Sequence, residues 1–136
     1  MAKPGDDFSA TYQNPGDHIV ITGINVPNPN GIYHIPDRID GKTVIGIASL
    51  AFDGCNATVV YLPKTVKNIA ANAFIGCAVT DIYFTQNIYI DYDAFPASSG
   101  ALTIHCPKNT HNRAYAAFRS YAHYYDAQWE EWNGEL

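Results

Sequence analysis

Four residues with polar aromatic rings stand immediately before apolar residues of a recurring pattern. They are His34, Tyr61, Tyr83 and His105, and the residues that follow them are Ile35, Leu62, Phe84 and Cys106. Tyr and His side chains offer apolar area with a polar tip and lose little conformational entropy on binding, which suits recognition. The chemistry that these residues indicate is the binding of a protein or a glycan.

Sequence signals for catalysis are weak. Gly41-Lys42-Thr43 resembles the end of a phosphate-binding loop, but Pro36 stands at the earlier position where such a loop requires a glycine. We therefore interpret this segment as a β-turn. His105 and Cys106 are adjacent, so on a strand they would face opposite sides and cannot form a catalytic dyad. We predict that the protein is not an enzyme.

Metal binding is not indicated either. The chain has three cysteines and five histidines, at His18, His34, His105, His111 and His123. Their spacings match neither an HExxH helix nor a zinc finger. We expect no metal and no cofactor.

Composition bounds the class of partner. The chain has 136 residues, enough for one domain, and a formal net charge of -5 with only 8 Lys and Arg. A nucleic-acid partner would require a basic face, so we expect no nucleic acid. No apolar run approaches the roughly 18 residues needed to span a bilayer, so membrane insertion is not expected. Residues 1–7 lack the basic and apolar regions of a signal peptide, which leaves a cytoplasmic location open beside export.

A repeat must position the four rings. The segment AFDGC at residues 51–55 returns as AFIGC at residues 73–77, and Leu62, Phe84 and Cys106 follow one another at the same spacing. The first interval, from Ile35 to Leu62, is longer because residues 38–42 insert a turn. Self-similarity at this period predicts a solenoid, in which each coil buries its apolar face against its neighbour.

The repeated segment, which we call the tag, combines core and turn residues. Phe52, Phe74 and Phe95 recur once per coil, and we expect them to form a ladder in the interior, where each would contribute about 1.5 to 3 kcal/mol. Gly54 and Gly76 are expected to supply the positive φ that ends a short helical turn.

The two tag cysteines, Cys55 and Cys77, would lie on adjacent coils within the reach of a disulfide, about 4.4 to 6.8 Å between Cα atoms. Their side chains should run parallel rather than toward each other. We therefore expect free buried thiols.

Different patterns flank the repeats. Phe8 to Tyr12 and His18 to Thr22 predict an N-terminal hairpin that covers the first coil. After Pro107 the apolar period becomes 3.6, which predicts a helix from Asn109 or Thr110 that ends at Asn133-Gly134. Its apolar face would be Tyr115, Phe118, Tyr121, Ala122, Tyr125, Trp129 and Trp132. We expect a single domain, 1–136, with an N-terminal cap at 1–30, repeats at 31–108 and a C-terminal helix at 109–136.

Strand alternation fixes the outward residues. If the apolar residues that follow the four polar rings point inward, the rings point outward in one column. The neighbouring outward column would be Ile32, Val59, Asp81 and Thr103. With strands about 4.8 Å apart, the ring column would span roughly 14 Å and present a flat strip to a ligand. The alternative is that these are ordinary cross-strand pairs that only stabilise the sheet.

The string IPDRIDGKTVIGIASLAFDGC, followed by VVYLPKTVKNIAANAFIGC, resembles the BspA-type leucine-rich repeat, the Treponema pallidum-like class. The resemblance covers residues 32–108 and implies a curved α/β solenoid, which we expect to have three to four coils. It also implies a role at bacterial surfaces or outside the cell, in adhesion or in binding host proteins or glycans. The alternative is a structural or assembly module that packs on other domains or self-associates. We expect a monomer or a weak homodimer.

Overall fold

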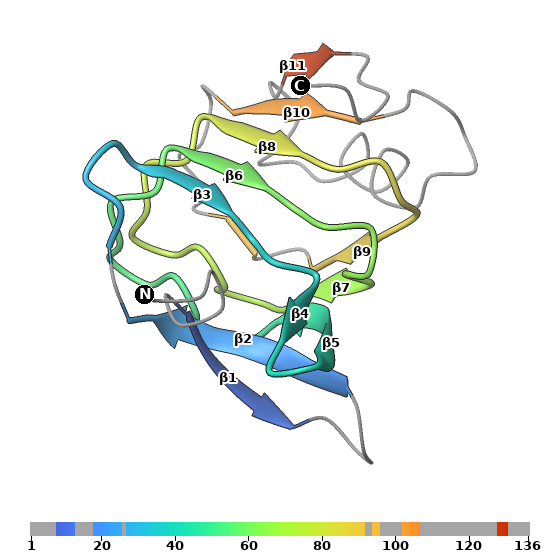
Figure 1. Ribbon diagram of the computed structural model, residues 1–136. Coiled ribbons are helices and arrows are strands. Elements are labelled where there is room, and N and C mark those ends of the chain that lie inside the picture. Colours follow the sequence, from blue (N-terminus) through green and yellow to red (C-terminus); the bar gives the residue numbers. More distant parts are fainter. Residues whose placement is uncertain are drawn as a thin grey trace.

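The computed structural model describes residues 8–12, 18–25, 27–91, 94–95, 102–106 and 128–130 (Figure 1). Within these ranges the chain forms strands and no helix, so the described part is a β-solenoid and the α/β character that the resemblance implied is not confirmed there. The strands are β1 (Phe8–Tyr12), β2 (His18–Ile24), β3 (Ile32–His34), β4 (Arg38–Ile39), β5 (Lys42–Ile47), β6 (Val59–Tyr61), β7 (Asn68–Ile69), β8 (Asp81–Tyr83), β9 (Tyr89–Ile90), β10 (Thr103–His105) and β11 (Gln128–Glu130).

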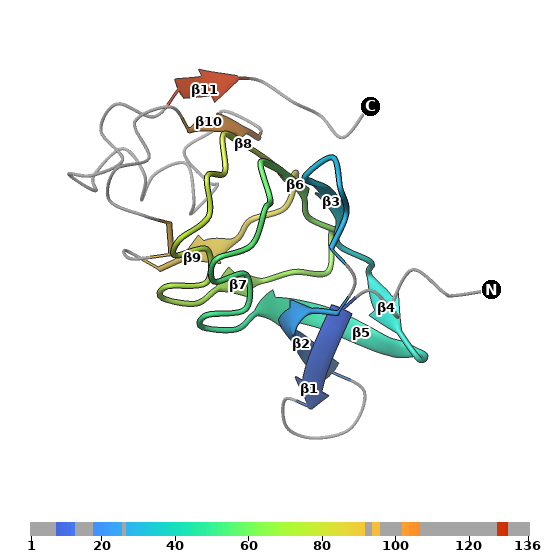
Figure 2. The same ribbon diagram turned by 90° about the vertical axis from the view of Figure 1, so that its left-hand side faces the viewer.

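Two sheets enclose the core. The first sheet has the order β1-β2-β5-β7-β9, with β4 paired to β5, and the second has the order β11-β10-β8-β6-β3. Figure 2 shows the chain passing from one sheet to the other in each coil, from β3 to β5, from β6 to β7 and from β8 to β9. The four parallel strands β3, β6, β8 and β10 mark successive coils, which confirms a solenoid of three to four coils.

The predicted N-terminal hairpin is present. Strands β1 and β2 pair antiparallel, and β2 then pairs parallel with β5. Phe8 of β1 is buried and its ring centroid lies 6.3 Å from that of Phe52. The hairpin therefore covers the edge of the first sheet and adds one aromatic ring to the core, as a solenoid end requires.

The insertion before the second coil is also the predicted turn. Strands β4 and β5 pair antiparallel, and the two residues between them, Asp40 and Gly41, have φ values of 54° and 78°. Two successive positive φ values define the tight hairpin turn that Asp-Gly favours. Gly41-Lys42-Thr43 thus belongs to a hairpin and not to a phosphate-binding loop.

The tags build the interior. Phe52, Phe74 and Phe95 are buried, with ring centroids 4.9 Å apart at both steps, which confirms the expected ladder. Gly54 and Gly76 have the predicted positive φ, at 65° and 78°. Backbone hydrogen bonds join one tag to the next: the Phe52 amide donates to Ala73, and the Gly54 amide donates to Ile75. Each tag therefore fixes the position of its neighbour.

At the end of β8, which has no proline after it, the Gln86 side chain forms hydrogen bonds with the backbone. Thr85 follows Phe84 where the other strand ends have proline, so it keeps a backbone N–H, which Gln86 Oε1 accepts at 3.0 Å. The amide nitrogen of Gln86 donates to the carbonyl oxygens of Pro63 and Val66, at 2.8 and 3.0 Å. Gln86 thus links the third coil to the second, since buried backbone groups need partners.

The predicted C-terminal helix is wrong where it can be tested. Most of residues 109–136 lies outside the described residues, but Gln128–Glu130 forms β11, which pairs parallel with β10. An uncovered β10 would leave a row of unpaired N–H and C=O groups, and pairing with β11 satisfies them. Trp129 lies on this strand, opposite Ile104, and not on a helix. The domain boundaries at residues 30 and 108 stay predictions.

Candidate functional site

The parallel register of the second sheet aligns the four ring residues. His34 pairs with Tyr61, Tyr61 with Tyr83, and Tyr83 with His105. The apolar residues that follow them are all buried: Ile35, Leu62, Phe84 and Cys106. The expected inward positions are therefore confirmed, and the four rings lie on the opposite face of the sheet.

The four rings stack face to face, and we call them the ring stack: His34, Tyr61, Tyr83 and His105. The ring centroids are 4.4, 4.4 and 3.9 Å apart along this order, and the ring planes are 2°, 17° and 6° from parallel. These separations are shorter than the usual strand spacing of about 4.8 Å. Each inner ring thus has both faces covered by its neighbours.

Exposure falls along the stack. His34 is exposed, Tyr61 and Tyr83 are half-buried, and His105 is only 7% exposed. The expectation that His105 is an exposed outward residue is therefore wrong, although it lies in the column. Tyr83 covers one face of its ring, its Nε2 lies 2.8 Å from Asp81 Oδ2, and β11 lies beside its strand. The open part of the stack is its His34 end.

The second outward column is also aligned. Its residues, Ile32, Val59, Asp81 and Thr103, are paired in register and half-buried. Asp81 is the charged member, and its carboxylate accepts a hydrogen bond from Thr80 Oγ1 at 2.7 Å in addition to its contact with His105. This column fixes the closed end of the ring stack rather than extending its open surface. Whether either column binds a ligand stays a prediction.

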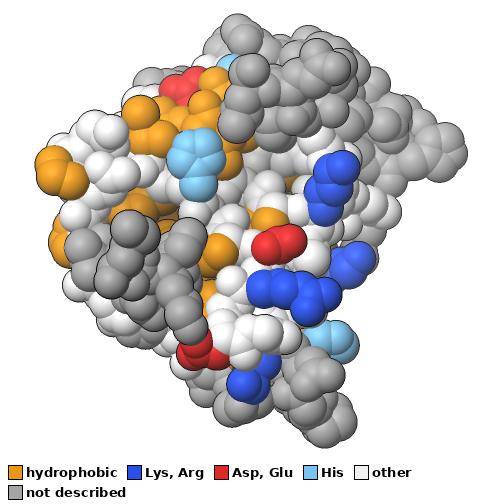
Figure 3. Space-filling view, viewed as in Figure 1, with side chains coloured by type: hydrophobic (Ala, Val, Ile, Leu, Met, Phe, Trp, Pro, Cys, Tyr) orange, Lys and Arg blue, Asp and Glu red, His pale blue; other side chains and the backbone are white. Residues whose placement is uncertain are grey.

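The basic side chains in view in Figure 3 lie away from the stack. In Figure 3, histidine and hydrophobic side chains lie next to one another over the second sheet. The Lys and Arg side chains in view gather on the side of β4 and β5. The face of the second sheet in view (Figure 3) therefore lacks the basic character that an anionic ligand needs.

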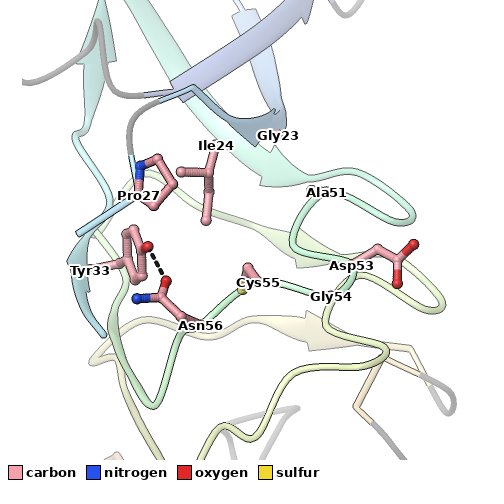
Figure 4. A pocket seen from close by; sticks show the side chains of 9 residues that line it. All are labelled: Gly23, Ile24, Pro27, Tyr33, Ala51, Asp53, Gly54, Cys55 and Asn56. Atoms are coloured by element: carbon pink, nitrogen blue, oxygen red, sulfur yellow. Dashed lines mark hydrogen bonds between the residues drawn. The ribbon is translucent and has the colours of Figure 1, made fainter. Parts of the chain in front are cut away.

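A cavity of about 480 Å³ lies between the end of β2 and the first tag, and the sequence did not indicate it (Figure 4). Tyr33 donates its hydroxyl hydrogen to Asn56 Oδ1, and Asn56 Nδ2 donates to the Asn28 carbonyl at 2.7 Å. In Figure 4 the side chains of Ile24 and Pro27 face the loop that carries Asn56. The cavity is built from segments far apart in the chain, so no local pattern could have revealed it.

The tag cysteines meet at this cavity. Cys55 lines it and is half-buried, Cys77 is buried, and both are free thiols, as expected. Their sulfur atoms lie 2.7 Å apart, however, so the expectation that the side chains run parallel is wrong. Residue register alone did not determine the side-chain rotamers, which bring the two sulfurs together.

The contact between the two sulfurs gives the two thiols different pKa values. The hydrogen bond with Cys77 lowers the pKa of Cys55 from 9.0 to about 7, while burial opposes this shift. The same hydrogen bond, together with burial, raises the pKa of Cys77 above its ordinary value. Of the two cysteines, Cys55 therefore loses its proton more readily. The resulting thiolate is the nucleophilic form of cysteine.

Among the residues that the structure describes, no group of three or more His, Cys, Asp or Glu side chains is arranged to hold a metal ion. A search of the same residues finds no helix long and apolar enough to cross a membrane.

The sequence matches the family described as "BspA type Leucine rich repeat region (6 copies)" over residues 35–126. No curated protein matches it. Among solved structures it is similar to a T. pallidum leucine-rich repeat protein, with a TM-score of 0.60, 19% identity and coverage of 98% of this chain and 65% of that one. A leucine-rich repeat protein from Bacteroides ovatus matches with a TM-score of 0.43, 15% identity and coverage of 76% and 47%. The chain thus spans less than two thirds of the length of either protein.

Proposed function

The chain belongs to the BspA-type leucine-rich repeat family, and from this premise we propose that it is a non-enzymatic module that binds a protein ligand through the ring stack. Leucine-rich repeat proteins generally act in protein interaction and not in catalysis, so the family supports the class of function. The position of the binding surface rests on the geometry of the stack.

The single observation that carries the proposal is the continuous stacking of His34, Tyr61, Tyr83 and His105. Side chains held in this way have lost their rotamer freedom before a ligand arrives, so binding needs little further ordering. Tyrosine is enriched in interfaces because it combines a large apolar area with a hydroxyl group. The two half-buried tyrosines form the centre of such a surface.

The stack favours a protein over a glycan. Both faces of Tyr61 and Tyr83 are covered by neighbouring rings, so their faces are not free to stack on a sugar. Half-buried rings stacked in this way suit packing against the side chains of a protein surface. A glycan ligand is retained as an outcome of the test.

The site of action that we propose is the bacterial surface or the extracellular medium, with an adhesion-type role. Its support is the family and the low content of charged residues, 15%. Detection of the protein with antibodies on intact cells, compared with detection after lysis, tests this part separately. A signal that requires lysis would contradict it.

Binding is tested with a screen of the purified chain against immobilised extracellular-matrix proteins and glycans. Each hit is repeated with the double variant Tyr61→Ser, Tyr83→Ser. The matched control is Tyr89→Ser, which removes a tyrosine that is 41% exposed on β9 of the other sheet. Circular dichroism establishes that all three proteins are folded.

We expect a protein hit that the double variant loses by at least about tenfold in Kd, which is about 1.4 kcal/mol, and that Tyr89→Ser keeps. Equal binding by the double variant would show that the ring stack is not the binding surface. Binding to glycans alone would replace the protein ligand by a glycan.

The alternative is an assembly module, and one observation limits how it would assemble. At the edge strand β3, the Ile32 amide donates to Asn30 Oδ1 and its carbonyl accepts from Asn28 Nδ2, both at 2.9 Å. These contacts occupy backbone groups that a second copy would need for strand pairing. Pairing through β3 is therefore disfavoured, and the form of this alternative that we test is self-association through the face of the ring stack. A concentration-dependent dimer in sedimentation that the double variant abolishes, without any ligand found, would favour this alternative.

A further inference from the structure

The backbone places the two tag cysteines on adjacent coils, and their side-chain rotamers bring the two sulfurs together. They occupy the same position in consecutive tags, which are joined by the hydrogen bonds from Phe52 to Ala73 and from Gly54 to Ile75, at 2.8 and 3.1 Å. The Cys77 sulfur also lies within hydrogen-bonding distance of the Phe52 carbonyl. The pair is therefore a fixed feature of two packed coils.

The two sulfurs differ in access. Cys55 lines the cavity of about 480 Å³ and is half-buried, whereas Cys77 lies behind it and is 6% exposed. A reagent that enters the cavity thus meets the Cys55 sulfur first. Cys106, the third cysteine, is 0% exposed in the core and offers an internal comparison.

The cavity can hold a small molecule beside Cys55. Its volume lies within the range of about 300 to 1,000 Å³ that is typical of small-molecule sites. Its polar groups are the Tyr33 hydroxyl and the Asn56 amide, and Ile24 and Pro27 supply an apolar wall (Figure 4). Asp53 also lies at the cavity, so the carboxylates of an entering ligand would have to lie away from this side chain.

We infer that Cys55 and Cys77 form a dithiol–disulfide site, in which Cys55 attacks a low-molecular-weight disulfide of the glutathione type that enters the cavity and Cys77 resolves the mixed disulfide. In the first step a bond forms between Cys55 Sγ and one sulfur of the small disulfide. The disulfide bond of that molecule breaks, and its other half leaves as a thiolate that takes a proton.

In the second step Cys77 attacks Cys55 Sγ. The Cys77 proton passes to solvent, a bond forms between the two protein sulfurs, and the second small thiolate leaves. Over both steps the protein loses two electrons and two protons, and the small disulfide is reduced to two thiols. The sulfurs start 2.7 Å apart, so a disulfide length of about 2.05 Å needs a movement of less than about 1 Å.

The order of attack follows from acidity and access together. Cys55, with its pKa of about 7, is the better attacking thiol near neutral pH, where a thiol with a matched pKa is most effective. Once Cys55 carries the mixed disulfide, its hydrogen bond no longer raises the pKa of Cys77, although burial still does. Cys77 then lies beside the mixed disulfide as the resolving thiol.

The test uses the intact, reduced chain equilibrated with mixtures of reduced and oxidised glutathione. Samples are quenched with acid, unfolded and titrated for free thiols, and the linked peptides are identified by mass spectrometry. The variants are Cys55→Ser and Cys77→Ser, with Cys106→Ala as the matched control that leaves the pair intact. Circular dichroism shows which variants are folded.

We expect the three free thiols of the chain to fall to one, with a peptide link between Cys55 and Cys77. Cys77→Ser should stop at a single glutathione on Cys55, Cys55→Ser should take up glutathione at least about tenfold more slowly than Cys77→Ser, and Cys106→Ala should still close the bridge. Three thiols persisting at high oxidised glutathione, a stable mixed disulfide in the unmodified chain, or a link to Cys106 would each overturn the inference. If the serine variants do not fold, the thiol count and peptide link of the unmodified chain decide alone.

Discussion

Tyr61 and Tyr83 lie face to face on neighbouring coils, with ring centroids 4.4 Å apart and ring planes 17° from parallel. Because the strands that carry them pair in register, the contact between the rings is fixed by the solenoid itself. The two tyrosines therefore form one packed unit on the outer face of the sheet. Effects of substitutions within such a unit are not additive, so the double variant and both single variants are needed to apportion binding.

We expect substitutions in the core and in the ring stack to lower the free energy of unfolding by different amounts. Phe74→Ala removes a fully buried ring that contacts Phe52 and Phe95, and should lower the free energy of unfolding by about 3 to 5 kcal/mol. Tyr83→Ser removes a half-buried ring with two stacking neighbours and should cost about 1 to 2 kcal/mol. Urea unfolding measures both. Equal losses would mean that a ring in the stack contributes as much to the free energy of unfolding as a ring in the core.

Leu50 offers a stabilising substitution. It is 54% exposed and has a φ of 63°, whereas Asn72 stands at the equivalent position of the next coil with a φ of 61°. Left-handed backbone costs most L residues about 1 to 2 kcal/mol, and asparagine tolerates it better. Leu50→Asn should therefore raise stability by about 0.5 to 1 kcal/mol, as measured by thermal unfolding.

The reciprocal change is the control for this prediction. Asn72→Leu places a bulky residue in the same backbone conformation and should lower stability by a similar amount. If Leu50→Asn lowers stability, the Leu50 side chain must make contacts whose loss outweighs the relief of backbone strain.

Gln86 should matter more than an ordinary polar loop residue. Its side chain accepts from the Thr85 amide and donates to the Pro63 and Val66 carbonyls. Gln86→Ala leaves these three backbone groups without that partner and should cost about 1 to 3 kcal/mol in urea unfolding. Gln86→Glu keeps an acceptor for Thr85 but loses the donor, so it should recover only part of this loss. A cost close to zero would mean that water replaces the side chain.

The period of the repeat allowed much of the fold to be predicted. It placed Leu62, Phe84 and Cys106 in the core and aligned Tyr61 with Tyr83, because solenoid coils stack in register. The tag glycines were predictable for the same reason, since a recurring turn needs a recurring positive φ.

Features that depend on how distant segments meet were missed. The apolar period near Trp129 favoured a helix, but the unpaired edge of β10 makes a strand more favourable there, and the local sequence contains no sign of that edge. The burial of His105 follows from the same pairing and from its contact with Asp81. The cavity depends on how the N-terminal hairpin packs against the first tag. The contact between Cys55 and Cys77 depends on their side-chain rotamers. The spacing of the repeat determines neither of these.

The reactivity of Cys55 should follow a low pKa. In the folded, reduced chain its alkylation by iodoacetamide should reach half of its maximal rate near pH 7, because the hydrogen bond with Cys77 lowers the pKa of Cys55 to about 7. Below that pH the thiol form dominates, and the rate should fall about tenfold per pH unit. Peptide mapping of alkylated Cys55 against pH measures the profile, with the urea-unfolded chain as the reference for the ordinary thiol pKa.

Cys77→Ala separates the hydrogen bond from the other influences on Cys55. With this partner removed, burial and the charge of Asp53 remain and both raise the pKa of Cys55, while the weak hydrogen bond from the Ala57 amide still lowers it. The half-maximal rate should therefore move to higher pH, toward the profile of the unfolded chain. A profile that Cys77→Ala leaves unchanged would show that the contact between the two sulfurs does not control the acidity of Cys55. The backbone around the thiol would then be the cause.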